Sequence, residues 1–83
     1  MTIQDFIKKS TDCGYNVSIS ASAITKDVEF WMSKDNETTY RRHHQTEIEE
    51  ANIDVLSFIF DDMSYKIENV LAKKRKSQLT IIK

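Results

Sequence analysis

The fold is decided by residues 15–43, which read YNVSISASAITKDVEFWMSKDNETTYRRH. Apolar and polar side chains alternate along residues 15–22 and again along 28–33, which is the period of a strand with one buried face. A polar turn over 33–37 separates the second strand from a third, which we predict over Thr38–His43. Short strands joined by short turns predict an antiparallel meander that buries one face.

A short helix is predicted before the sheet. Thr2 followed three residues later by Asp5 is a variant of the capping box that begins helices. Gly14, the single glycine, stands where a left-handed residue commonly ends a helix. The apolar side chains of this helix share one face, and they are Ile3, Phe6 and Ile7.

The longest predicted helix ends near Lys76 and has two competing starts. Thr46 with Glu49 fits a capping box, whereas Asn52 fits a simple N-cap. The tail, Gln78–Ile82, has β-branched residues and is compatible with a short fourth strand. At about 100° per residue, one apolar face points toward the core, and it comprises Leu56, Ile59, Phe60, Met63, Ile67, Val70 and Leu71.

These elements predict an α+β fold: a helix, a three-stranded antiparallel sheet and a long helix, with one or both helices on one face of the sheet. The length of 83 residues predicts a single domain, 1–83. Trp31 is out of phase with its apolar neighbours, so we expect it to face away from the helices. The expected core residues are Phe6, Ile7, Val17, Ile19, Phe30, Ile59, Phe60, Met63 and Ile67.

Composition excludes several classes of protein. With one cysteine, Cys13, the chain forms neither an internal disulfide nor a multi-cysteine metal site. Hydrophobic residues make up 40% and charged residues 30%, the balance of a folded chain. No apolar run approaches the roughly 18 residues that a membrane helix needs. We therefore expect a small soluble protein of the cytoplasm.

Catalytic and metal-binding motifs do not emerge. One glycine cannot build a phosphate-binding loop. Cys13 has His43 or His44 as a nominal base, but a lone thiol near a helix end is more often a small buried hydrophobe. The two histidines with Glu47 fall short of the four ligands of a structural zinc site, and adjacent strand residues point to opposite faces. We predict a non-enzymatic protein without a cofactor or a metal.

The net charge of −1 conceals an uneven distribution. Residues 44–65 carry acidic side chains and neither Lys nor Arg, whereas residues 66–83 are predominantly basic. Such asymmetry concerns partners and steering rather than the fold.

The outward face of the long helix combines acids with two aromatic residues at spacings of three or four. The helix dipole and a solvated surface account for acids near the helix start, but not for Asp61 and Asp62 in mid-helix. Phe58 either anchors a partner within a polar rim or packs under a loop or the tail. We predict that this face binds a basic site on a larger host protein, or a second copy of the chain. The predicted partner-binding residues are Glu47, Glu50, Asp54, Phe58, Asp61, Asp62, Tyr65 and Glu68.

The basic C-terminal segment supports an alternative function. Residues 73–76 read KKRK, and together with Lys66 and Lys83 they offer cations for phosphate groups. Residues 41–44, RRHH, add a second patch if the third strand lies near. A helix C-terminus also favours cations for structural reasons. The alternative is a nucleic-acid-binding module.

Two families share the predicted order of elements. In the double-stranded-RNA-binding domain, lysines open the second helix, whereas acids open it here. A second likeness is carried by the opening helix and a Tyr-x-Val strand, through Met1, Ile3, Asp5, Phe6, Ile7, Tyr15, Val17 and Ser20. In these residues the chain resembles the small phage-encoded anti-CRISPR proteins of Gram-positive bacteria, which inhibit the RNA-guided type II nuclease. The resemblance implies a phage-encoded inhibitor acting in the host cytoplasm, with acidic side chains in the nuclease's basic cleft.

Overall fold

The computed structural model describes residues 1–49 and 54–81, with side chains for residues 1–48 and 54–76. It confirms the predicted α+β class and the order of its elements. The elements are α1 (Ile3–Asp12), β1 (Asn16–Ala21), β2 (Asp27–Lys34), β3 (Glu37–His44), α2 (Gln45–Glu49) and α3 (Val55–Ile81).

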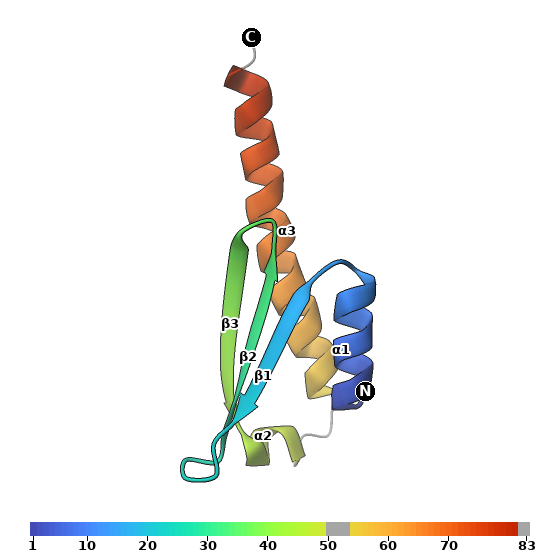
Figure 1. Ribbon diagram of the computed structural model, residues 1–83, viewed down its shortest axis with the longest axis vertical. Helices are drawn as coiled ribbons and strands as arrows, with labels where there is room; N and C mark the ends of the chain where they lie inside the picture. The colour runs from blue at the N-terminus through green and yellow to red at the C-terminus, as the bar shows by residue number, and fades with distance from the viewer. Residues whose placement is uncertain (50–53, 82–83) are drawn as a thin grey trace.

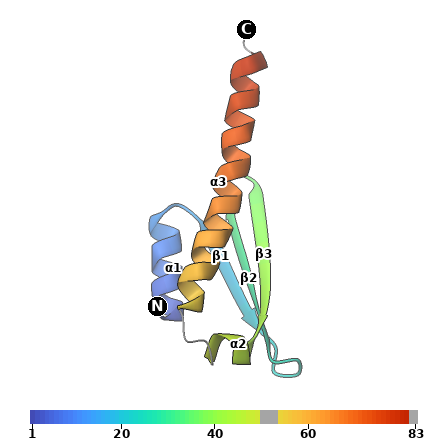
Figure 2. The same cartoon turned by 180° about the vertical axis from the view of Figure 1, so that it is seen from behind.

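The sheet has the strand order β1-β2-β3, and both pairings are antiparallel. The β2–β3 hairpin turns through Asp35 and Asn36, whose φ angles of 50° and 68° are the positive values that a two-residue hairpin turn requires. Helices α1 and α3 lie side by side on one face of the sheet, and no described helix covers the other face (Figures 1 and 2). Two layers therefore enclose the core.

Aromatic rings from α1, β2 and α3, and from Tyr15 just before β1, meet at the centre of the core. Phe6 of α1 lies 5.6 Å from Phe30 of β2 and 6.2 Å from Phe60 of α3, and Tyr15 stacks edge-on against Phe60 at 6.3 Å. Residues at alternate positions of β2 are buried, as the period of two predicts. The buried apolar residues are Phe6, Tyr15, Val28, Phe30, Met32, Leu56, Ile59, Phe60, Met63, Ile67 and Leu71.

Both ends of α1 are capped as the sequence predicts. Thr2 and Asp5 form the complete capping box, and Gly14 has a φ of +87° directly after the helix. Ser10 is fully buried, and its hydroxyl donates to the carbonyl of Phe6 at 2.7 Å. That bond lets a polar side chain lie in the core without an unpaired donor.

Both predicted starts of the long helix are wrong in the structure. The chain forms the short helix α2 first, and α3 begins only at Val55 because Asp54 caps it. The Asp54 side chain accepts from the Ser57 amide at 3.2 Å, and its carbonyl accepts from the Phe58 amide. Thr46, the second residue of α2, instead hydrogen-bonds to His44 at the end of β3, and Asn52 lies outside the described residues.

The predicted helix end and tail strand are also corrected. Helix α3 continues to Ile81, so residues 78–81 are helical, and Ile82 lies outside the described residues. The helix runs past the β2–β3 hairpin, which makes the molecule 52 Å long and only 23 by 19 Å across (Figure 1). Beyond the hairpin, α3 has no sheet to cover it.

The edges of the core differ from the sequence prediction. Val70 is 38% exposed although its neighbour Leu71 is buried, and Ile7 is 42% exposed because α1 turns Phe6 and Ser10 inward instead. Val17 and Ile19 lie on the edge strand, half-buried and packed against the core. Periodicity thus identified the centre of the core but not its rim.

Candidate interaction surface on the outward face of helix α3

The outward face of α3 carries two exposed aromatic side chains. Phe58 is 55% exposed and Tyr65 is 70% exposed, and Asp61 is exposed between them. Spacings of three and four residues place all three on one face, pointing away from the sheet. We call Phe58, Asp61 and Tyr65 the α3 stripe. The alternative that Phe58 packs under a loop or the tail does not hold among the described residues, since more than half of the side chain is exposed.

The ring of Phe58 is supported from one side by Arg41. The guanidinium carbon lies 5.2 Å from the ring centroid, within the range of a cation–π contact. Arg41 reaches the ring from the helix-covered face of β3 and also donates to Asp62 at 2.5 Å. The ring is therefore positioned while more than half of it stays open to solvent.

Asp62 forms ion pairs with two basic residues of its own chain. It accepts from Arg41 and also pairs with Lys66, one turn along α3, at 3.1 Å. Partial burial opposes its ionisation, but the hydrogen bonds from Lys66 and Arg41 outweigh that effect and lower the pKa of Asp62. The Asp62 carboxylate thus links α3 to β3, and the two basic side chains within the chain largely compensate its charge.

Asp54 and Glu68 are similarly engaged. Hydrogen bonds from Ser57, followed by the one from the N-terminal ammonium, lower the pKa of Asp54 to about 2. Glu68 accepts from the Tyr15 hydroxyl at 2.7 Å and from Lys34 at 3.1 Å, and both bonds lower its pKa. Burial, and then the bond to Glu68, raises the pKa of Tyr15 to about 12.

Two further predicted acids precede α3 in the sequence. Glu47 belongs to α2, where its carboxylate lies 3.0 Å from His43, and Glu50 lies outside the described residues. The continuous acidic stripe expected from Glu47 to Glu68 is therefore divided by the break between α2 and α3. Among the described members of the predicted set, Asp61 is the acid whose carboxylate contacts neither a cation nor a histidine.

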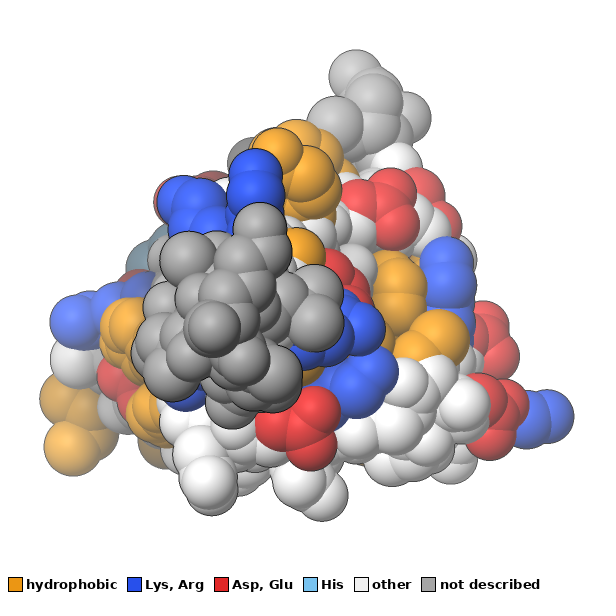
Figure 3. Space-filling model, turned by 90° about the horizontal axis from the view of Figure 1, so that it is seen from above, with side chains coloured by type: hydrophobic (Ala, Val, Ile, Leu, Met, Phe, Trp, Pro, Cys, Tyr) orange, Lys and Arg blue, Asp and Glu red, His pale blue; other side chains and the backbone are white. Residues whose placement is uncertain are grey.

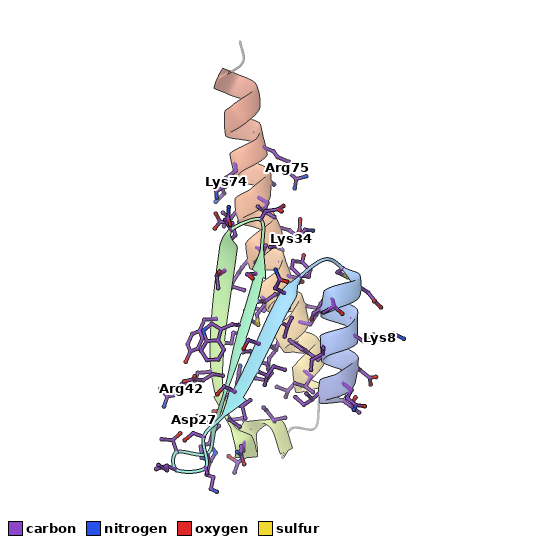
Figure 4. All side chains as sticks on the ribbon, in the orientation of Figure 1. Lys8, Asp27, Lys34, Arg42, Lys74 and Arg75 are labelled. Atoms are coloured by element: carbon purple, nitrogen blue, oxygen red, sulfur yellow. The ribbon has the colours of Figure 1, made fainter. Side chains whose placement is uncertain are left out.

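The basic segment over residues 73–76 lies on the projecting part of α3. All four side chains are exposed, and Lys74 and Arg75 point to opposite sides of the helix above the hairpin (Figure 4). Lys74 pairs with Glu37, and Arg75 lies 3.9 Å from Glu68. A hollow of about 390 Å³ separates this part of α3 from the hairpin and is lined by Lys34, Asp35, Glu68, Leu71, Lys74 and Arg75.

Basic and acidic side chains are thus interspersed at this end of the molecule (Figure 3). The second basic patch expected at residues 41–44 is split by the sheet. Arg41 and His43 face the helices, whereas Arg42 pairs with Asp27 on the open face (Figure 4). Alternation along a strand accounts for the separation.

An aromatic pair on the open face of the sheet was not among the predicted site residues. Trp31 and Tyr40 stand opposite each other on β2 and β3, with ring centroids 5.3 Å apart. A shallow hollow beside Trp31 is lined by Asn16, Val17, Ser18, Trp31 and Ser33. The phase of Trp31 within its strand predicted the face correctly, but the pairing with Tyr40 required the register of β3.

Three further findings bear on function. No group of three or more His, Cys, Asp or Glu residues is placed to hold a metal ion in the part of the chain that the structure describes. None of the helices, over the same residues, is long and apolar enough to cross a membrane. No family model, curated protein or solved structure matches the chain.

Proposed function

We propose that this chain is a non-enzymatic binding protein, an inhibitor or accessory factor, which engages a basic site on a larger host protein through the α3 stripe. One observation carries the proposal: Phe58 and Tyr65 are 55% and 70% exposed on one helix face, around an acid without an ion pair. Large aromatic side chains in a polar rim are the residues that most often dominate binding energy.

The acids have unequal roles in this proposal. Asp61 would meet the partner's cations directly and speed the encounter, whereas the aromatic rings would set the rate of dissociation. Asp54, Asp62 and Glu68 chiefly position the stripe, since each is already paired within the chain. Arg41 orients Phe58 for contact.

The resemblance of the first residues to phage-encoded anti-CRISPR proteins suggests which partner to test first. That partner is an RNA-guided type II nuclease in the host cytoplasm, whose DNA-reading cleft is basic. Since most acids of the predicted set are engaged internally, we propose contact through anchored aromatics and one acid rather than mimicry of DNA by a dense row of carboxylates.

The test compares variants of the stripe with matched changes elsewhere. The chain is immobilised and presented with the purified guide-loaded nuclease and, separately, with host lysate treated to remove nucleic acid. Phe58→Ala is matched by Tyr40→Ala, an exposed aromatic on the open sheet face, and Asp61→Lys by Asp12→Lys, an exposed acid of α1.

The proposal predicts a captured protein that is lost with Phe58→Ala and kept with Tyr40→Ala. Asp61→Lys should slow association, and Asp12→Lys, which changes net charge equally, should affect it far less. A partner captured equally by all four variants would place the binding surface elsewhere.

Nucleic-acid binding remains the second candidate because α3 carries residues 73–76 beyond the sheet with all four side chains exposed. Replacing these four residues by Gln should then abolish binding to labelled DNA or RNA and flatten the salt dependence by roughly one unit per lost contact. Nucleic-acid binding at physiological salt, lost in that variant, would rank this function above the first.

A further inference from the structure

The outer edge of β1 lacks the features by which proteins usually protect a free strand. β1 is an edge strand, since it pairs with β2 alone. Its six residues, Asn16–Ala21, contain neither a charged residue nor proline. Each residue of β1 pairs with one residue of β2, in unbroken order along the whole strand, so β1 has no bulge. Charges, prolines and bulges are the common ways to prevent edge-to-edge pairing.

The opposite edge of the sheet provides an internal comparison. β3 is also an edge strand, but it carries Glu37, Arg41 and Arg42 and ends in two histidines. Charged side chains along an edge strand are one of the ways in which proteins prevent pairing with a further strand. The two edges of one small sheet are therefore unequally protected, and β1 is the open one.

Backbone geometry identifies the groups that β1 presents outward. The amide of Ser22 donates to the carbonyl of Asp27 at 3.0 Å, which marks these two as a hydrogen-bonded pair of the ladder. Because such pairs alternate in an antiparallel ladder, the even-numbered residues of β1 bond to β2. The amides and carbonyls of Val17 and Ile19 consequently point away from the sheet.

Helix α1 adds apolar surface beside this edge. Phe6 is fully buried against the sheet, and Lys9 lies 4.6 Å from the ring of Phe60 on α3, so these two residues define how α1 is rotated. Ile3 and Ile7 project on the side away from α3, and they are 40% and 42% exposed. Figure 1 shows α1 beside β1 at this margin of the molecule.

We propose that a second copy of this chain occupies the edge, by antiparallel pairing of β1 with β1 across a twofold axis at Ser18. This register places Val17 opposite Ile19 of the second copy on the helix-covered face and joins the two sheets into one. In this register odd-numbered residues lie opposite odd-numbered residues of the other copy. The half-buried apolar side chains of the two copies therefore meet on the same face of the sheet.

The composition of the edge favours a second copy over an unrelated peptide. An uncharged strand offers no charge to select a foreign partner, yet it is compatible with itself in an antiparallel arrangement, since no like charges meet. The same arrangement brings the two α1 helices together at the axis, where Ile3 and Ile7 become covered. The surface is distinct from the α3 stripe.

Sedimentation of the intact chain from about 1 to about 200 µM tests the proposal, because weak dimers dissociate within this range. A monomer–dimer equilibrium is expected. Ser18→Lys places two cations opposite each other at the axis and should raise the dissociation constant about tenfold or more. Thr38→Lys, an equivalent exposed position on the open face of β3, should leave it unchanged.

Amide exchange locates the interface and keeps the test independent of folding defects. The amides of Val17 and Ile19 should become slower to exchange as concentration rises, while those of Tyr40 and Arg42, which point outward from β3 by the same alternation, should not. Phe58→Ala should leave the dimer intact, which separates this proposal from the proposed function.

A wild-type chain that is monomeric throughout the range, or a dimer unaffected by Ser18→Lys, would overturn the proposal. Protection of the Val17 and Ile19 amides only on adding another protein, with the isolated chain monomeric, would also overturn it and assign the edge to a foreign strand.

Discussion

The two faces of α3 differ sharply although they are built from similar residues. Phe60 is 6% exposed and touches the rings of Phe6 and Tyr15, whereas Phe58, two positions earlier, is 55% exposed and has the Arg41 guanidinium over its ring. The two phenylalanines differ in the direction in which the helix points their side chains. The inward face should therefore determine stability and the outward face recognition, so that substitutions on each face change one property and spare the other.

The largest effect on stability is expected from Phe60→Ala. Removing a buried aromatic ring loses its transfer free energy and leaves a cavity, so unfolding should become easier by about 3–5 kcal/mol. Urea denaturation followed by circular dichroism measures this change. A loss below about 1 kcal/mol would show that the inward face does not carry the core.

A smaller effect is expected where the faces meet, at Arg41. Arg41→Gln leaves Asp62 partly buried with only Lys66 as its cation and should cost about 1–2 kcal/mol. Arg42→Gln is the comparison variant, because the Arg42 side chain is 55% exposed against 22% for Arg41, while the carboxylates of Asp27 and Asp62 are similarly shielded; the more solvated arginine should cost less to remove. If urea denaturation shows equal losses of stability for the two variants, the ion pair between Arg41 and Asp62 stabilises the fold no more than the one between Arg42 and Asp27.

The start of α3 should make stability depend on acidic pH. The pKa of Asp54 is about 2 in the folded chain, against 3.8 for an unperturbed carboxyl group. Because the folded pKa is depressed, its contribution is present above pH 3.8 and is lost as pH falls toward 2. Asp54→Asn can still cap the helix but not titrate, so its stability curve should be flatter over this interval. Parallel curves for the two proteins would contradict the assignment.

The smallest change is expected at the hairpin, which belongs to neither face. Asn36→Gly places the residue best suited to positive φ in the second position of the turn. Stability should rise by less than about 1 kcal/mol, and binding should not change. A destabilised Asn36→Gly variant would indicate that the asparagine side chain holds the turn by contacts of its own.

The sequence predicted those features that depend on neighbours along the chain. Thr2, Asp5 and Gly14 determine both ends of α1 locally, and the period of two along β2 is strong because one face of that strand is buried. The phase of α3 was also predictable, since Phe58 and Tyr65 fall opposite a continuous apolar stripe.

The features that sequence reasoning missed depend on contacts between distant segments. The sequence offered two starts for the long helix, Thr46 and Asn52, whereas Asp54 caps it with support from the N-terminal ammonium, 53 residues away. The pairing of Asp62 with Arg41 similarly requires that β3 and α3 pack together. The number of acidic residues on the outward face of α3 therefore overstated its negative charge, because a helical projection does not show ion pairs with residues of other elements.

The most direct test of the proposed role of α3 measures stability and binding of Phe58→Ala in the same preparation. We expect the free energy of unfolding to change by less than about 1 kcal/mol, since the ring lies outside the core. Dissociation from the partner should accelerate about 30-fold, the equivalent of an anchor worth about 2 kcal/mol. Destabilisation by several kcal/mol, or unchanged dissociation in a folded variant, would contradict the assignment of the outward face to recognition.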